Sequence, residues 1–181
     1  NISLGSLNRT ELLGSLSATQ SLDVLRQVLP EAMMRTPVAR AILDKAGGNP
    51  FYLEELAHSM VDPGPDGDRA IPDNVLSVVT ARIDRLGESP KRLLQAAAIL
   101  GREFSLDLIQ AVWPGGEPLQ PHLRDLTRLE FLYERAGKGR SFAFKHALTQ
   151  QAAMGMLLAP ARRELHRRAA QALEAQHSGA P

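Results

Sequence analysis

Residues 62–68 read D-P-G-P-D-G-D, and this cluster constrains the folding of the chain more than any other feature of its sequence. Proline fixes φ and lacks the backbone N–H, while glycine and aspartate favour turns, so the segment can continue neither a helix nor a strand. With 181 residues, the chain has room for two small domains. We therefore predict a domain boundary here, with a linker over 62–70.

The residues before this boundary are predicted to form a small helical bundle. Apolar residues recur there at helical spacing, and glycine, proline and capping residues mark the expected helix ends. The predicted helices run from a cap at Asn8 or Thr10 to about Ala18, over 22–29, from Pro37 to Gly47-Gly48, and over 51–61 after Pro50.

The residues after the boundary are predicted to form helices first and a β-hairpin second. Segments 131–135 and 141–144 alternate apolar and polar residues around a basic, glycine-containing tip, which is typical of a hairpin. Helices followed by such a wing are typical of a winged-helix domain. The predicted fold class is mainly α, a small helical bundle followed by a winged-helix domain with one β-hairpin. The predicted helices run from Pro72 to Gly87, from Ser89-Pro90 to Gly101, from Ser105 to about Val112, and over 119–129, 146–158 and 161–176.

Composition excludes several functional classes. Lysine and arginine outnumber aspartate and glutamate by one. The net charge is therefore too small to indicate nucleic acid or an anionic membrane as a partner. Cysteine is absent, which excludes thiol nucleophiles and disulfide scaffolds and suits a cytoplasmic location. The apolar runs fall far short of the roughly 20 residues that a bilayer requires. The chain begins without methionine or a signal sequence, and we expect it to be part of a longer protein.

The common catalytic motifs are also missing from the sequence. The phosphate-binding loop G-x-x-x-x-G-K-[ST] does not occur, and Gly137-Lys138-Gly139 joins two predicted strands where such a loop would open a helix. The histidines have no i, i+4 pair that could hold zinc on one helix face, and the nucleophile pattern G-x-S-x-G does not occur. We therefore expect no enzymatic activity from this chain alone.

Several motifs together resemble those of the signal-transduction P-loop ATPases with numerous domains, the STAND family. The likeness spans nearly the whole chain and is closest to the ATPase region of bacterial multidomain proteins with a class III adenylate or guanylate cyclase domain. The large LuxR-type transcriptional regulators are a near second. The motifs that carry it are G-N-P-F-Y-L-E-E-L from Gly48, I-P at 71–72, A-R-I-D-R-L from Ala81, A-A-A-I-L-G-R-E-F from Ala96, F-A-F-K-H-A-L from Phe142 and R-R-E-L-H from Arg162.

The resemblance implies a division of the chain and its partners. Residues 1–61 would hold the end of the ATPase core, with a strand at 2–4, and a helical lid; 71–160 would be the winged helix, and 161–181 the start of a following helical, repeat-like region. The partners would be the upstream P-loop core and downstream helical repeats of the same chain. ATP or ADP with magnesium would bind mainly to that core, so a phosphate-binding loop is expected upstream of this chain.

The resemblance also assigns nucleotide-binding positions. Gly48, Asn49 and Pro50 match a G-x-P element whose proline lies against the adenine, although a helix end followed by a helix cap explains the same residues. Lys145 and His146 resemble the M-H-D element of plant resistance and animal apoptosis switch proteins, whose histidine contacts the diphosphate of ADP. A helix N-terminus carrying these residues suits an anion on its own terms. The alternative is a partly buried histidine that caps the helix, and Ala147 replaces the acidic residue of the motif.

The interpretation that we carry forward is a nucleotide-sensing and signal-relay module that couples the ATP/ADP state to an output domain, most closely a cyclase. The alternative is a DNA-binding winged helix of a LuxR-type transcriptional regulator. Local basic residues support the alternative, although arginines along a helix are usually a solvated surface, and we do not expect DNA to bind this module. These basic residues are Lys138, Arg140, Lys145, Arg162, Arg163, Arg167 and Arg168.

Overall fold

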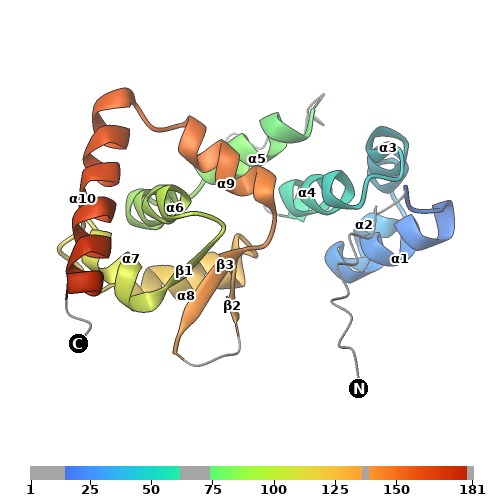
Figure 1. The fold of residues 1–181 in the computed structure, drawn as a ribbon. Coiled ribbons are helices and arrows are strands. Elements are labelled where there is room, and N and C mark those ends of the chain that lie inside the picture. Colours follow the sequence, from blue (N-terminus) through green and yellow to red (C-terminus); the bar gives the residue numbers. More distant parts are fainter. Residues whose placement is uncertain (1–14, 62–73, 136–138, 179–181) are drawn as a thin grey trace, which may run out of the picture. The chain divides into compact units, whose positions relative to one another are not determined.

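The structure is a computed structural model, and it describes residues 15–61, 74–135 and 139–178. The chain divides into two compact units, Asn1–Pro63 and Gly64–Pro181, which we describe separately. The described residues are mainly helical with one small antiparallel sheet, as the sequence predicts (Figure 1). The predicted strand at 2–4, the linker over 62–70 and the hairpin tip at 136–138 lie outside the described residues.

The first unit contains four helices within its described part. Its longest helix, α4, packs against α1 and α3, and the fully buried residues Leu25, Ile42, Leu53 and Leu56 come from these three helices. The proline at the start of α4 occupies the first helical position, as predicted. The helices are α1 (Ala18–Val28), α2 (Glu31–Met34), α3 (Pro37–Ala46) and α4 (Pro50–Val61).

We predicted a helix that ends near Ala18, and the prediction is wrong for its described residues. Residues 15–17 are not helical, and α1 begins at Ala18. The reason is a capping box: the Ser17 hydroxyl accepts a hydrogen bond from the Gln20 N–H at 3.2 Å, and the Gln20 side chain accepts one from the Ser17 N–H at 2.9 Å. This reciprocal pair satisfies two N–H groups that a starting helix leaves free, so it sets the helix start here. The proposed caps Asn8 and Thr10 lie outside the described residues.

The second unit has the element order of a winged-helix domain (Figure 1). Helix α6 lies at its centre, because it packs against α7, α8, α9 and α10. Side chains from α6, α8 and the hairpin strands supply most of the fully buried core. The elements are α5 (Val75–Asp84), α6 (Glu88–Leu100), β1 (Glu103–Ser105), α7 (Leu106–Val112), α8 (Leu119–Arg128), β2 (Leu132–Arg135), β3 (Ser141–Phe144), α9 (Ala147–Gly155) and α10 (Ala159–Ser178).

The sheet confirms the hairpin and adds a strand that the sequence pattern did not predict. Strands β2 and β3 pair antiparallel, and β1 pairs with the other edge of β3, which gives the order β1-β3-β2. Phe104 of β1 lies opposite Phe142 of β3, and their rings stack at 6.1 Å between centroids. Strand β1 has only three residues, too few for an alternating pattern to identify it.

Two predicted helix starts in this unit need correction. Helix α5 is capped by Asn74, whose side chain accepts a hydrogen bond from the Ser77 N–H at 2.8 Å, and begins at Val75. Helix α6 begins at Glu88 after Gly87, so Ser89 lies inside its first turn and does not cap it. The Ser89 side chain instead forms a hydrogen bond with Glu117. This bond is the main reason that the pKa of Glu117 lies below its ordinary value.

Helix α10 holds most of the predicted repeat-like region, 161–181. It packs against α7 and α6, and Leu165 and Ala169 are the buried residues on its inner side. The helix therefore covers one side of the second unit (Figure 1).

Candidate functional site

The predicted site residues of the second unit lie at the corner between β3 and α9. Backbone hydrogen bonds tie this corner to two other segments: the Phe144 N–H donates to Arg102 O at 2.9 Å, and the Lys145 N–H donates to Phe131 O at 3.1 Å. Because the backbone is anchored at both Phe144 and Lys145, Lys145 and His146 have defined positions next to the start of a helix.

His146 occupies the N-cap position of α9, but its side chain forms no capping hydrogen bond. The backbone performs part of that role, since the Thr149 N–H donates to His146 O at 3.2 Å. The imidazole is partly buried, and its Nε2 atom is shielded from solvent. A partly buried histidine is therefore present, as the alternative interpretation supposed, but the imidazole does not cap the helix.

The Lys145 ammonium group forms an ion pair with the Glu130 carboxylate at 2.7 Å. Glu130 follows α8 with φ near 60°, the left-handed conformation that residues other than glycine rarely adopt. An anion that binds Lys145 must therefore compete with a carboxylate from the same unit. Sequence analysis did not identify Glu130, because no local pattern shows that it faces a lysine 15 residues further along the chain.

Arg82 reaches the same end of α8 from α5. Its guanidinium donates a hydrogen bond to Leu129 O at 2.9 Å and lies over the Phe131 ring, 4.7 Å from the centroid. A cation near the last carbonyls of a helix complements the helix dipole. Arg82 therefore joins α5 to the segment that also supplies Glu130 to Lys145.

The predicted site residues of the first unit, Gly48, Asn49 and Pro50, form the turn between α3 and α4. Gly47 and Gly48 have φ values of 55° and 80°, so both are left-handed. Gly48 O accepts a hydrogen bond from the Leu16 N–H at 2.7 Å, and a Cβ atom on Gly48 would lie 2.8 Å from Leu16 O. The glycine is thus required both by its conformation and by close packing.

Asn49 caps α4, because its side-chain oxygen accepts a hydrogen bond from the Tyr52 N–H at 3.1 Å. Pro50 is the first residue of the helix and is partly exposed. These are the local structural roles that a helix end followed by a helix cap predicts. The two groups of predicted residues, Gly48–Pro50 and Lys145–His146, lie in different units.

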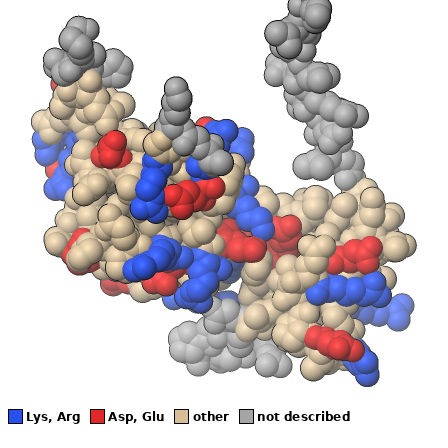
Figure 2. All heavy atoms as spheres, turned by 90° about the horizontal axis from the view of Figure 1, so that it is seen from below, with Lys and Arg blue, Asp and Glu red and all other residues tan. Residues whose placement is uncertain are grey.

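Two of the four arginines of α10, Arg167 and Arg168, are engaged with one acid. Glu164 accepts hydrogen bonds from Arg167 at 2.6 and 2.9 Å and from Arg168 at 2.9 Å. These bonds are the main cause that lowers the pKa of Glu164 to about 2. Figure 2 shows acidic and basic side chains interleaved over the visible face of the second unit, without a broad field of one sign.

The described residues show neither a metal-binding cluster nor a membrane-spanning helix. Residues 15–61, 74–135 and 139–178 contain no group of three or more histidines and acidic residues placed to hold a metal ion. Within those same ranges, no helix has the length and apolar character needed to cross a membrane.

Comparison with known proteins gives a match to part of an uncharacterized protein. No protein-family model matches the chain. An uncharacterized protein of Rhizobium meliloti (strain 1021) is 29% identical over 134 residues. The alignment covers 68% of this chain and 13% of the relative, so the chain matches a small part of a much longer protein.

Proposed function

We propose that this chain is the nucleotide-sensing and signal-relay part of a STAND-type ATPase, with a helical lid followed by a winged helix. The observation that carries the proposal is the position of Lys145 and His146, which lie consecutively where the last strand of the winged helix meets a helix N-terminus. This is the place at which the resemblance puts a diphosphate contact. The match to a small part of a long protein is consistent with a module inside a multidomain chain.

The residues at the corner are chemically suited to a diphosphate. Lys145 supplies a positive charge, and the first N–H groups of α9 favour an anion through the helix dipole. ADP or ATP with magnesium, held mainly by an upstream P-loop core, would supply the phosphate groups. In this role Lys145 would exchange Glu130 for phosphate, and Gly48–Pro50 of the lid would contact the adenine.

The relay would follow from this exchange. When Lys145 leaves Glu130, the segment after α8 loses one of its contacts to the β3–α9 corner, and Arg82 connects that same segment to α5. A ligand shifts a conformational equilibrium only by its differential affinity for the two states. The output domain, for which a cyclase is the closest candidate, would respond to the state that the nucleotide favours.

The experiment that tests the proposal uses the longer protein, with its upstream core. His146→Ala should weaken ADP binding more than ATP binding and raise basal output, because the proposed histidine contact exists in the ADP-bound state alone. A hydrogen bond to a charged group contributes roughly 1.5–3 kcal/mol, so ADP affinity should fall about tenfold or more. Isothermal titration with each nucleotide measures this difference.

Lys91→Ala is a suitable control, because Lys91 is a paired surface lysine of the same unit that contacts Asp84. It should leave both nucleotide affinities unchanged. The proposal fails if His146→Ala folds normally and keeps its ADP affinity, or if the complete reading frame lacks a phosphate-binding loop upstream.

A DNA-binding winged helix is the second candidate. The observation in its favour is the arrangement of α7, α8 and the hairpin, which places an exposed arginine, Arg124, on the second helix of the pair. The interleaved charges in Figure 2 weigh against it, since nucleic-acid binding relies on concentrated positive charge. Sequence-selective binding of duplex DNA that persists at physiological salt would favour this candidate.

A further inference from the structure

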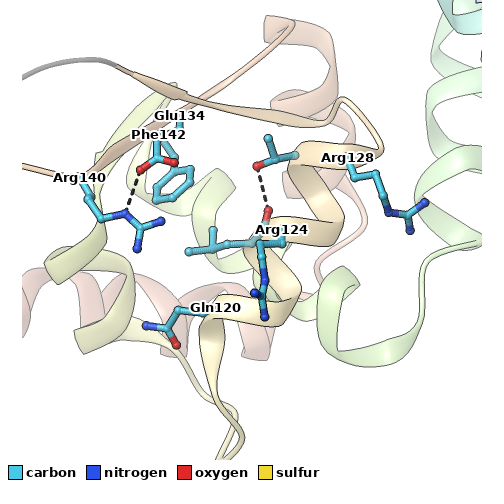
Figure 3. A pocket seen from close by; sticks show the side chains of 8 residues that line it. Gln120, Arg124, Arg128, Glu134, Arg140 and Phe142 are labelled. Carbon is cyan, nitrogen blue, oxygen red and sulfur yellow. Dashed lines mark hydrogen bonds and ion pairs between the residues drawn. The ribbon is translucent and has the colours of Figure 1, made fainter.

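An open groove of about 480 Å³ lies between α8 and the hairpin, and Figure 3 shows its side chains. Leu123 and Phe142 form its floor, and both are buried in the core of the second unit. None of its residues belongs to the predicted nucleotide site. The groove is lined by Gln120, Leu123, Arg124, Thr127, Arg128, Glu134, Arg140 and Phe142.

The α8 side of the groove presents hydrogen-bond donors. Gln120, Arg124 and Arg128 are spaced four residues apart, so they form one row about 12 Å long on the helix surface. Within the part of the chain that the structure describes, Gln120 and Arg124 make no hydrogen bond or ion pair, and both side chains are exposed. Arg128 makes a long, exposed ion pair with Asp125 at 3.6 Å. The row therefore offers guanidinium groups that a ligand can engage without breaking a strong contact.

The hairpin side of the groove is held in place. The Arg140 guanidinium pairs with Glu134 at 2.8 Å and lies over the Phe142 ring, 5.8 Å from its centroid. Figure 3 shows this pair facing α8 across the groove. A wall that is already ordered loses little conformational entropy when a ligand binds.

The chemistry of the groove selects an anionic ligand of a particular kind. Arginine pairs with carboxylates and phosphates through two parallel hydrogen bonds. Asp125 and Glu134 lie beside Arg128 and Arg140. A nucleic-acid backbone, with a negative charge on every phosphate, would be repelled by these two carboxylates. A peptide whose carboxylates are spaced apart can contact the arginines without lying next to Asp125 or Glu134. The accessible lining of the groove is partly apolar, which also suits a peptide that can place an aliphatic side chain between its acidic residues.

We propose that the groove between α8 and the hairpin binds an acidic, extended peptide segment of a partner protein. Carboxylates of the peptide contact Arg124 and Arg128, and an apolar side chain between them lies against the apolar part of the groove lining. The proposal is independent of nucleotide sensing, because it uses other residues and another ligand.

The test is a selection from a displayed library of random linear peptides of about a dozen residues, with the 181-residue chain as bait. Enriched peptides should carry two or more acidic residues separated by apolar ones. Fluorescence anisotropy with one enriched, labelled peptide should then show about tenfold or greater loss of affinity in Arg124→Glu, and a smaller loss in Arg124→Gln.

The matched control is Arg163→Glu on α10, which changes the net charge equally. Arg163 is also exposed and makes no hydrogen bond or ion pair among the described residues. Peptide affinity should be unchanged in this variant. The proposal is overturned if enriched peptides lack acidic residues, if both charge reversals weaken binding equally, or if duplex DNA binds more tightly than the peptide at physiological salt.

Discussion

At the scale of single residues, Glu130 has an unfavourable backbone conformation that closes α8 and places its carboxylate beside Lys145. Its φ of 60° allows its N–H to donate to Thr127 O at 3.0 Å and the Phe131 N–H to donate to Leu126 O at 2.9 Å, which closes α8. The left-handed conformation costs a residue with a Cβ atom roughly 1–2 kcal/mol. From this position the carboxylate reaches Lys145.

Replacing Glu130 with glycine should therefore stabilise the second unit. Glycine removes the conformational cost, and the lost ion pair is exposed and worth at most about 1 kcal/mol. We expect Glu130→Gly to be more stable than Glu130→Ala by about 1 kcal/mol in urea unfolding. Both variants lose the ion pair, so the comparison isolates the backbone. An alanine variant as stable as the glycine variant would contradict the strain argument.

Gly48 should tolerate substitution less well than its neighbour Gly47. A Cβ atom on Gly48 would lie 2.8 Å from Leu16 O, whereas one on Gly47 meets no atom within 4 Å, and both residues have positive φ. Gly47→Ala should cost about 1 kcal/mol from conformation alone, and Gly48→Ala about 1–3 kcal/mol in total because the turn must also shift. Thermal unfolding measures both. Equal losses would show that the contact with Leu16 relaxes freely.

At the scale of elements, the surface of α10 is organised around Glu164. Its folded pKa of about 2 lies below the ordinary value of 4.5, so the fold favours the ionised form. The stabilisation is complete above about pH 4.5 and is lost as the pH falls towards 2. Because the pair is partly exposed, the effect is small and sensitive to salt.

The pH dependence of this cluster can be measured with Glu164→Gln. The variant should have a lower urea midpoint than the wild-type protein at pH 6, and the difference should shrink at pH 3, where Glu164 is largely protonated in the unfolded chain but still largely ionised in the folded protein. Salt at about 1 M should also reduce the difference at pH 6. A difference that is independent of both pH and salt would assign the effect to packing.

At the scale of the whole molecule, the predicted site residues are divided between two units. Gly48–Pro50 belong to the first unit and Lys145–His146 to the second. The sequence lacks a phosphate-binding loop. In our proposal, both groups of residues contact a nucleotide that an upstream core holds.

The isolated chain should therefore hydrolyse no ATP. Phosphoryl transfer depends on a cradle for the phosphates and on a bound metal ion, and our proposal places both outside this chain. Phosphate release with ATP and magnesium should equal a protein-free blank. Turnover above the blank that disappears in Lys145→Ala or His146→Ala would show that the chain carries a catalytic site of its own.

Local sequence patterns predicted the features that neighbouring residues determine. Gly47 ends α3, Pro50 starts α4, Ser105 caps α7, and the alternating segments around 136–140 form β2 and β3. Each depends on the conformational preferences of a few consecutive residues or on hydrogen bonds across one turn. The capping box at Ser17 was equally local, and the pattern S-x-x-Q at 17–20 could have identified it.

Only the tertiary structure determined the features that join distant residues. Strand β1 exists because Phe104 lies opposite Phe142, Arg82 binds a carbonyl 47 residues away, and Lys145 pairs with Glu130 across the end of α8. The groove needs α8 and the hairpin side by side. The sequence by itself determined the mainly helical fold with one hairpin and several of the helix ends, because those choices are made within a few residues. Which side chains meet was decided by packing, because the free energy of burying α6 against its neighbours depends on the whole unit.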